Sequence, residues 1–309
     1  MTGSKMRVAV IGVGHLGRHH ARILSNLENV QLVAVADIKA DRAAQVGGPL
    51  GARATTDIRE LFGAVDAVTI AVPTEAHGDV ALPFLERGIP VLVEKPLART
   101  LREADRMLAA ACGSGATFAV GHTERHNPAV RAATTVVSHP RFIEVHRLGT
   151  FPERSLDIDV VFDLMIHDLD IVLSLVHSEV ETIDAVGVPV LTDRVDIANA
   201  RLRFADGCIA NLTASRISRD RVRKIRFFQP DAYVSIDYAE QEVEVYRLVR
   251  GDGARPDIQG GPIAVEREEP LRREMIDFIA AARTGGEPAV DGEQGRRALE
   301  VATRIVEKM

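Results

Sequence analysis

A histidine and several carboxylates lie in one otherwise apolar segment, residues 157–174. If the segment is an α-helix, with about 100° per residue, its polar side chains fall on one narrow stripe. The stripe comprises Asp159, Asp163, His167, Asp170 and Ser174. A solvated helix face would normally carry Lys or Glu, and this stripe has neither. Asp163 and His167 are neighbours at i, i+4, and a histidine beside a carboxylate in a cleft can act as a base near neutral pH.

A lysine that could take part in catalysis follows the short apolar run 90–93, in the sequence Glu94-Lys95-Pro96. Pro96 favours an extended backbone at Lys95, which helps to hold its ammonium at the end of a strand. An ammonium in that position can donate to a substrate hydroxyl and stabilise a developing alkoxide. The alternative interpretation is a surface lysine paired with Glu94.

Three glycines, Gly12, Gly14 and Gly17, follow the apolar run 7–11 and precede helix-forming sequence. Between a strand and a helix, this spacing is typical of a dinucleotide-binding turn. The first glycine permits the tight turn, the second lets a pyrophosphate approach the backbone, and the third lets the helix pack on the strand. We expect His15 and Leu16, inside the turn, to contact the cofactor as well.

A carboxylate ends the next apolar run: Asp37 lies twenty residues after Gly17. At this place the dinucleotide fold needs an acid that binds the adenosine ribose, and the acid repels a 2′-phosphate. The sequence therefore favours NAD over NADP. Lys39 and Arg42 lie close enough to soften that preference.

Ligands of open α/β sheets bind beyond the carboxyl ends of the strands, so the residues after the other predicted strands are further candidates. The candidates for cofactor contacts are Ala71, Pro73, Thr74, His77, Glu94, Lys95 and His122. The sequence His122-Thr-Glu-Arg-His126 lacks the order of a zinc motif, and no metal site is expected. We predict instead that His122, Arg125 and Asn127 follow the last strand into a cleft.

Basic residues are concentrated in the segment 216–226: Arg216, Arg219, Arg221, Arg223, Lys224 and Arg226. One interpretation is a charged edge strand that discourages aggregation. The other is a site for a substrate diphosphate, because guanidinium groups suit phosphate oxygens. Arg216 and Arg223 are therefore substrate candidates. Arg125, Asn127 and Arg154 are further candidates for substrate contacts.

Composition describes an ordinary globular chain of 309 residues, with 46% hydrophobic and 27% charged residues. A net charge of −6 argues against general affinity for nucleic acid or for an anionic membrane. No apolar run approaches the roughly 20 residues that cross a bilayer. Cys112 and Cys208 are isolated, which suggests a reducing compartment, and we expect a cytoplasmic protein.

Alternating strands and helices over residues 1–121 predict an N-terminal α/β domain with a doubly wound parallel Rossmann sheet. Its expected strands are 6–11, 31–36, 66–72, 90–93 and 116–120, and its expected helices are 15–27, 39–46, 57–63, 76–87 and 100–112. Residues 122–309 predict an α+β domain with an open, mostly antiparallel sheet, suited to substrate binding and oligomerisation. One apolar helix (158–176) is followed there by strands at 181–190, 195–204, 208–215, 223–229, 232–237 and 242–249, an exposed loop at 251–262, and helices at 270–284 and 292–308. The last helix is free to pack back on the Rossmann domain.

With these residues in place, the chain resembles the glucose–fructose oxidoreductase/inositol dehydrogenase (Gfo/Idh/MocA) family over nearly its whole length. The resemblance depends on four motifs that occur in the family's order and at its approximate spacings. They are Gly12-x-Gly14-x-x-Gly17, Glu94-Lys95-Pro96, Gly121-His122 and Asp163-x-x-x-His167. Stretches around Gly121, Phe162 and Ala214 are similar to the nucleotide-sugar branch, which includes UDP-N-acetylglucosamine 3-dehydrogenases. His126 departs from the Phe that is commoner there.

The resemblance implies hydride transfer between a sugar carbon and NAD(P), with Lys95, Asp163 and His167 as the catalytic set. It implies that the substrate is a nucleotide sugar, UDP-N-acetylglucosamine oxidised to its 3-keto form. One alternative is a free-sugar or inositol dehydrogenase. A second is a non-catalytic NAD-binding regulatory protein, although such proteins lose the Lys or His that this chain retains. A broad open sheet also suggests a homodimer or homotetramer.

Overall fold

The computed structural model describes residues 4–151, 158–249 and 257–309. The chain divides into two compact units. Unit 1 comprises Met1–His122 and Leu271–Arg296, and unit 2 comprises Thr123–Pro270 and Arg297–Met309. Each unit has its own sheet and its own apolar core.

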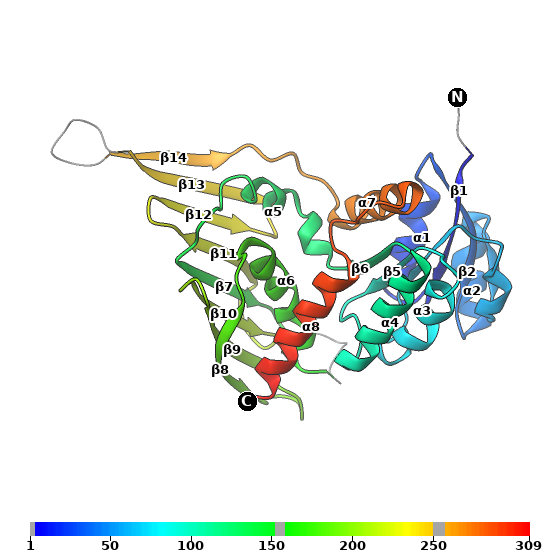
Figure 1. Ribbon diagram of the computed structural model, residues 1–309, viewed down its shortest axis with the longest axis horizontal. Coiled ribbons are helices and arrows are strands. Elements are labelled where there is room, and N and C mark those ends of the chain that lie inside the picture. The colour runs from blue at the N-terminus through cyan, green and yellow to red at the C-terminus, as the bar shows by residue number, and fades with distance from the viewer. Residues whose placement is uncertain (1–3, 152–157, 250–256) are drawn as a thin grey trace. The chain divides into compact units, whose positions relative to one another are not determined.

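Unit 1 is built on a six-stranded parallel sheet with the strand order β3-β2-β1-β4-β5-β6 (Figure 1). The strands are β1 (Met6–Ile11), β2 (Val30–Ala36), β3 (Arg53–Thr55), β4 (Ala67–Ile70), β5 (Val91–Glu94) and β6 (Phe118–Gly121). The helices are α1 (Gly17–Ser25), α2 (Ala40–Gly47), α3 (His77–Leu85), α4 (Leu101–Ser114), α7 (Pro270–Thr284) and the first turn of α8 (Gly292–Val306), with short 3₁₀ turns η1 (Gly48–Leu50), η2 (Ile58–Leu61) and η3 (Thr74–Ala76). The strand order reverses between β1 and β4, which is where a doubly wound sheet binds its ligand.

The helices of unit 1 cover the sheet as the expected Rossmann architecture requires. Apolar side chains of α1, α2 and α7 form one core with β1 and β2. Helices α3 and α4 pack against each other, and α3 contacts β4 and β5. The start of α8 lies against β6, because the backbone of Ala119 pairs with that of Asp291. The doubly wound parallel sheet is thereby confirmed.

Unit 2 is built on an eight-stranded sheet with the strand order β14-β13-β12-β11-β7-β10-β9-β8. The strands are β7 (Phe142–Leu148), β8 (Val180–Val188), β9 (Ile197–Phe204), β10 (Ile209–Ser215), β11 (Val222–Phe228), β12 (Ala232–Asp237), β13 (Glu242–Val249) and β14 (Asp257–Ile263). All neighbours are antiparallel except β7 and β10, which are parallel. The prediction of a mostly antiparallel sheet is therefore confirmed.

The sheet of unit 2 is covered by helices on one face. The helical elements are η4 (Thr123–His126), α5 (Pro128–Ala133), the π-helical turn η5 (Val161–Met165), α6 (Ile166–Leu175) and the end of α8. Apolar side chains of α5, η5, α6 and α8 form one core with alternate residues of the strands. Strand β9 shows the alternation clearly, with every second residue buried. The residues between them point to the opposite, open face, because side chains alternate along a strand.

Several expected elements were wrong or missed. The expected helix at 57–63 is the short 3₁₀ turn η2, and the strands β3 and β7 and the helix α5 were not expected. Within the expected loop 251–262, residues from Asp257 onward form β14. Two glycines and a proline made this strand look like a loop in the sequence. The strand lies at the edge of the sheet, where a missing backbone donor is tolerated. Gly260 is required there, since a Cβ would lie 1.9 Å from the Val245 oxygen.

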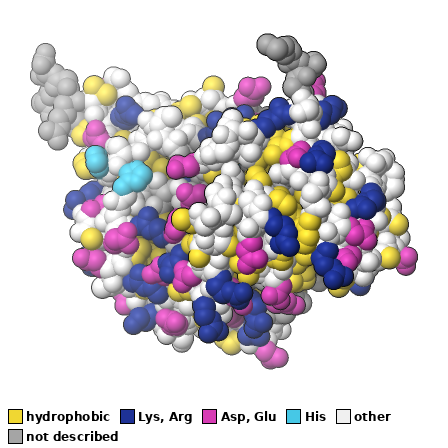
Figure 2. All heavy atoms as spheres, turned by 45° about the vertical axis from the view of Figure 1, so that its right-hand side comes forward, with side chains coloured by type: hydrophobic (Ala, Val, Ile, Leu, Met, Phe, Trp, Pro, Cys, Tyr) yellow, Lys and Arg dark blue, Asp and Glu magenta, His cyan; other side chains and the backbone are white. Residues whose placement is uncertain are grey.

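Charges of both signs are mixed on the surface. Figure 2 shows Lys and Arg side chains interspersed with Asp and Glu over the face that it draws. Neither sign is therefore confined to one part of the face that the figure draws. Among the described residues, no helix is both long and apolar enough to span a bilayer.

Candidate functional site

The glycine turn after β1 has the geometry that a dinucleotide requires. Gly12 adopts a φ of 81°, which favours glycine. A Cβ on Gly17 would lie 1.8 Å from the Gly12 oxygen, so this glycine lets α1 pack on the turn. A Cβ on Gly14 would meet nothing nearer than the Arg42 Nη1 at 4.0 Å, so open space remains where a pyrophosphate would lie. The turn therefore fits NAD.

Asp37 follows β2, as predicted, but its carboxylate also supports the turn itself. Its Oδ2 accepts from the Val13 amide at 3.1 Å, and its Oδ1 accepts from the Lys39 amide at 2.9 Å. Arg42 Nη1 lies 3.3 Å from Oδ2. Arg42, which the sequence placed within reach of this acid, therefore pairs with it directly.

The remaining cofactor candidates follow the carboxyl ends of adjacent parallel strands in unit 1. Ala71, Pro73 and Thr74 follow β4, Glu94 and Lys95 end β5, and His122 follows β6. Parallel strands bring these ends to one edge of the sheet. The structure thus gathers every cofactor candidate of unit 1 at the edge that carries Gly12. His122 is buried there, and the peptide bond between Lys95 and Pro96 is cis.

His77 is also buried, and its ring is surrounded by backbone carbonyls. Its Nε2 lies 3.0 Å from the Val72 oxygen, and its Nδ1 lies 3.1 Å from the Pro96 oxygen and 3.2 Å from the Leu97 oxygen. Burial lowers the pKa of His77, against the opposing effect of these carbonyls. The ring ties the end of β4 to the turn that contains Lys95.

In unit 2, Asp163 and His167 are both half-buried, but they do not share one regular α-helix. Asp163 lies in the π-helical turn η5, and His167 lies in the first turn of α6. A π-turn contains an extra residue, so the uniform 100° spacing assumed for the polar stripe fails before Ile166. Asp159 lies before the turn and its carboxylate accepts from the Val195 amide at 3.0 Å. π-turns frequently occur at functional sites.

Arg125 and Asp170 form a pair inside unit 2. Arg125 Nη1 donates to the backbone oxygen and to Oδ1 of Asp170, both at 3.3 Å. Asp170 is buried, and its Oδ2 has no hydrogen-bond partner among the described residues. Burial raises the pKa of Asp170 to about 7, although Arg125 opposes the shift. A carboxyl that titrates near neutral pH therefore lies one helical turn from His167.

Arg147 and Asp168, which the sequence analysis did not single out, connect the turn η4 that carries Arg125 to the helix α6 that carries His167. Arg147 on β7 donates to both carboxylate oxygens of Asp168, at 2.7 and 2.9 Å, and to Glu124 at 3.0 Å. Burial raises the pKa of Asp168, with Arg147 opposing the shift. The sequence offered one signal for this ion pair, namely Asp168 within an apolar helix. A buried carboxylate requires a cationic partner, so such an aspartate predicts one.

The basic segment 216–226 is not an edge strand, so that interpretation was wrong. Strand β11 lies between β7 and β12. Lys224 and Arg226 pair with Asp237 and Glu144, at 3.2 and 2.8 Å. Arg223 belongs to the other face of the strand, opposite Arg147, and its Nη1 lies 4.0 Å from Glu124.

Two of the other substrate candidates serve the fold. Arg216 is buried, donates to Asp196 at 2.8 Å, and caps the Ile158 oxygen. Asn127 is also buried and accepts from the Ala129 amide at the start of α5. Arg154 lies outside the described residues.

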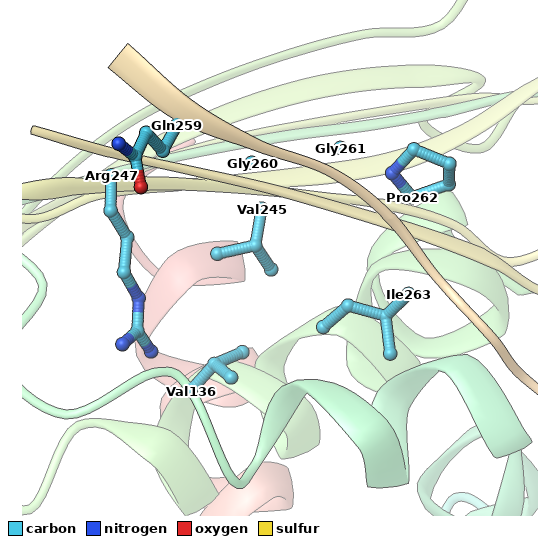
Figure 3. Close-up of a pocket in the computed structure, with 8 residues that line it drawn as sticks. All are labelled: Val136, Val245, Arg247, Gln259, Gly260, Gly261, Pro262 and Ile263. Carbon is cyan, nitrogen blue, oxygen red and sulfur yellow. The ribbon is translucent and has the colours of Figure 1, made fainter. Parts of the chain in front are cut away.

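A hollow of about 510 Å³ in unit 2 contains none of the candidate residues (Figure 3). It is lined by Val136, Val245, Arg247, Gln259, Gly260, Gly261, Pro262 and Ile263. Mostly apolar side chains from β13 and β14 surround it, and Arg247 and Gln259 supply its polar groups.

Comparison with known proteins agrees with this geometry. A family described as "Oxidoreductase family, NAD-binding Rossmann fold" matches residues 6–122, and the "GFO/IDH/MocA C-terminal domain" matches residues 129–234. UDP-N-acetylglucosamine 3-dehydrogenase from Acidithiobacillus ferrooxidans is 39% identical over 97% of this chain and 96% of its own. Its solved structure superimposes with a TM-score of 0.93, at 37% identity, over 99% of this chain and 98% of its own. Myo-inositol 2-dehydrogenase from Thermotoga maritima is 27% identical over 95% of this chain and 93% of its own. The chain therefore belongs to the GFO/IDH/MocA family of oxidoreductases, and its Rossmann unit is of the NAD-binding type.

Proposed function

We propose that this protein is an NAD-dependent dehydrogenase that oxidises a secondary hydroxyl of a nucleotide sugar, UDP-N-acetylglucosamine, to its 3-keto form. The observation that carries the proposal is the end-to-end identity of 39% with the enzyme of that name. Inositol dehydrogenases that match nearly the whole chain are 27% identical. Under this proposal, residues 1–121 bind NAD and residues 122–309 bind the sugar.

Each catalytic candidate has a distinct role in this proposal. The glycine turn would hold NAD, which would supply the acceptor for the hydride that leaves the carbinol carbon. His167 takes up the hydroxyl proton as a general base, and Asp163 orients its ring. Lys95 donates a hydrogen bond to the same oxygen and stabilises its developing negative charge.

The binding roles follow from charge and placement. The turn of Gly12, Gly14 and Gly17 would hold the pyrophosphate, with Asp37 on the adenosine ribose. Arg223 is the substrate-diphosphate candidate that the positions of the arginines favour, because its side chain is about half exposed whereas Arg216 is enclosed. Arg125 stays a candidate for a sugar contact.

The test compares UDP-N-acetylglucosamine with N-acetylglucosamine and myo-inositol as substrates, with reduction of NAD followed by absorbance. We expect turnover with the UDP-sugar alone. Turnover with the free sugar or the inositol instead would assign the protein to the other enzymes of the family. Tight NAD binding without turnover of any of them would favour a regulatory protein.

A variant of the proposed base separates chemistry from cofactor binding. His167→Ala should lower kcat by about 10²- to 10⁴-fold, the usual contribution of a general base. Its Kd for NAD, measured by calorimetry, should stay near the wild-type value. Comparable losses of turnover and NAD affinity would show that His167 has another role.

We also propose that the protein works as a homo-oligomer in the cytoplasm. The open face of the unit 2 sheet carries a row of neighbouring aromatic rings, from Phe142 through Phe228 and Tyr233 to Tyr246, with centroids 5.3 to 6.3 Å apart. Exposed apolar rows of this kind favour association with a partner surface. A second copy of the chain supplies such a surface through two-fold symmetry. The isolated cysteines favour a reducing compartment.

A further inference from the structure

A buried histidine that the sequence gave no reason to single out lies beside the turn of Lys95. His20 belongs to α1, and its side chain is fully buried. Its Nε2 lies 3.0 Å from Oε1 of Glu94, and its Nδ1 lies 3.3 Å from the hydroxyl of Thr69 on β4. The ring thus connects the helix after the glycine turn to two neighbouring strands of the sheet.

The chemistry of Glu94 fixes the direction of one of these hydrogen bonds. A carboxylate only accepts, so the Nε2 that faces Glu94 carries the hydrogen. The Nδ1 faces the hydroxyl of Thr69, which can either donate or accept. Both ring nitrogens of His20 are therefore satisfied, as a buried polar side chain requires.

Glu94 in turn is held from several sides. Its Oε2 accepts from the backbone amide of Lys95 at 3.3 Å. A Cβ on Gly121 would lie 2.9 to 3.0 Å from the carboxyl group, so this glycine on β6 leaves the room that the carboxylate fills. Because His20, Gly121 and the Lys95 amide surround it, the carboxylate cannot rotate without losing a contact.

The other flank of the same turn is held by the ring of His77. Its Nδ1 lies within 3.2 Å of the oxygens of Pro96 and Leu97, which follow Lys95 directly. A buried histidine therefore fixes the chain on each side of Lys95: His20 acts through Glu94 on one side, and His77 holds Pro96 and Leu97 on the other. A side chain whose backbone is fixed on both sides is pre-organised for chemistry.

We propose that His20 is a positioning residue for Lys95, acting through the carboxylate of Glu94. The inference rests on the proposed function, in which Lys95 stabilises the reacting oxygen. Loss of the His20 hydrogen bond would free Glu94 and shift the Lys95 amide. Displacement of a catalytic group by about 1 Å can cost on the order of 100-fold in rate.

The test is a double-mutant cycle on kcat with Lys95. His20→Leu should lower kcat by about 10- to 100-fold in the wild-type background and by less than about twofold in a Lys95→Met background. His20→Gln, which keeps a donor of similar reach, should recover most of the loss. An equal loss in both backgrounds would overturn the proposal, because His20 would then act independently of Lys95.

Three further variants separate positioning from stability. Leu24→Ala removes a fully buried apolar side chain of the same helix and no hydrogen-bonding group, and it should leave kcat near the wild-type value. Gly121→Ala should push the carboxylate from its opposite side and reproduce the loss of His20→Leu. Gly113→Ala is its control, since a Cβ there would meet nothing within 4 Å. A loss of kcat in Leu24→Ala as large as in His20→Leu would reduce His20 to a packing role.

A measurement without turnover distinguishes failure of this inference from failure of the proposed function. The rate at which an amine reagent modifies Lys95, followed by mass spectrometry of its peptide, should change in His20→Leu but not in Leu24→Ala. The rates at Lys39 and Lys224 should stay constant. An unchanged rate at Lys95 would overturn the proposal whatever the substrate. If Lys95→Met leaves kcat unchanged while the modification rate responds, the catalytic role of Lys95 fails and the positioning by His20 stands.

Discussion

At the residue scale, the carboxylate of Asp37 supports the glycine turn and is the proposed contact of the NAD ribose. It accepts from the amides of Val13 and Lys39, which shapes the turn, and it follows β2, where a dinucleotide-binding fold places its ribose-binding acid. The guanidinium of Arg42 lies 3.3 Å away. The same cation would attract a 2′-phosphate once the carboxylate is removed.

Asp37→Ser should therefore weaken NAD binding and improve NADP binding. Loss of a hydrogen bond to a charged group costs about 1.5–3 kcal/mol, which predicts roughly a 10- to 100-fold rise in the Kd for NAD. Calorimetric titration with both dinucleotides measures the change. Asp41→Ser, an exposed acid in the neighbouring helix, is the control and should keep the wild-type preference. Unchanged selectivity in Asp37→Ser would remove Asp37 from the cofactor site.

The pair of Asp170 and Arg125 predicts a dependence of stability on pH. Burial raises the pKa of Asp170 to about 7. From the ordinary pKa of an aspartate up to pH 7, the unfolded chain has therefore lost a proton that the folded chain keeps, and stability falls as pH rises. Asp170→Asn removes this dependence.

We expect the free energy of unfolding of Asp170→Asn to rise relative to wild type by up to about 4 kcal/mol between about pH 4 and pH 7.5. Urea unfolding at several pH values measures it. Asp184→Asn, at an exposed site on β8, should run parallel to wild type. Parallel curves for Asp170→Asn would show that Asp170 does not titrate in this range.

At the element scale, an ion pair fixes the helix α6 to the sheet in addition to the apolar contacts. Arg147 on β7 holds Asp168 of α6 and Glu124 of η4 at once. The two elements that carry His167 and Arg125 are therefore held by one guanidinium. Removing one member leaves a buried charge without its partner, which is costly.

Asp168→Ala should lower the free energy of unfolding by about 3–5 kcal/mol, the usual cost of breaking a buried pair. Thermal and urea unfolding measure this loss. Asp184→Ala, on an exposed part of β8, is the matched control and should change stability little. A small effect of Asp168→Ala would mean that water reaches Arg147 and replaces the carboxylate.

At the scale of the whole molecule, the aromatic row on the open face of unit 2 predicts self-association. Phe228 and Tyr246 are each 37% exposed and belong to a continuous row of rings, and contiguous exposed apolar surface marks interaction sites. Tyr246→Lys with Phe228→Lys should convert the oligomer to a monomer, measured by light scattering after size exclusion. Ile38→Lys, at an exposed apolar residue of unit 1, should leave the mass unchanged. A wild-type protein that is monomeric at micromolar concentration would contradict the prediction.

The sequence by itself determined the elements whose pattern is local. The spacing of Gly12, Gly14 and Gly17 between a strand and a helix predicted the nucleotide turn, and the buried runs predicted the parallel sheet, because these signals depend on neighbours along the chain. Lys95 and His167 could also be chosen from the sequence as catalytic candidates, since few residue types can move protons or stabilise an alkoxide.

Only the tertiary structure decided which polar residues are enclosed in ion pairs and which stay accessible to a ligand. Arg216 and Arg223 are seven residues apart and look alike in sequence, but one is enclosed with Asp196 and the other is half exposed beside Glu124. In the sequence, His20 and Asp168 look like ordinary helix residues. Their partners in the fold, Glu94 and Arg147, belong to strands far away along the chain. The partner of a buried charge or histidine ring is usually distant in sequence. The free energy of such a pair depends on its burial, which a local sequence pattern does not determine.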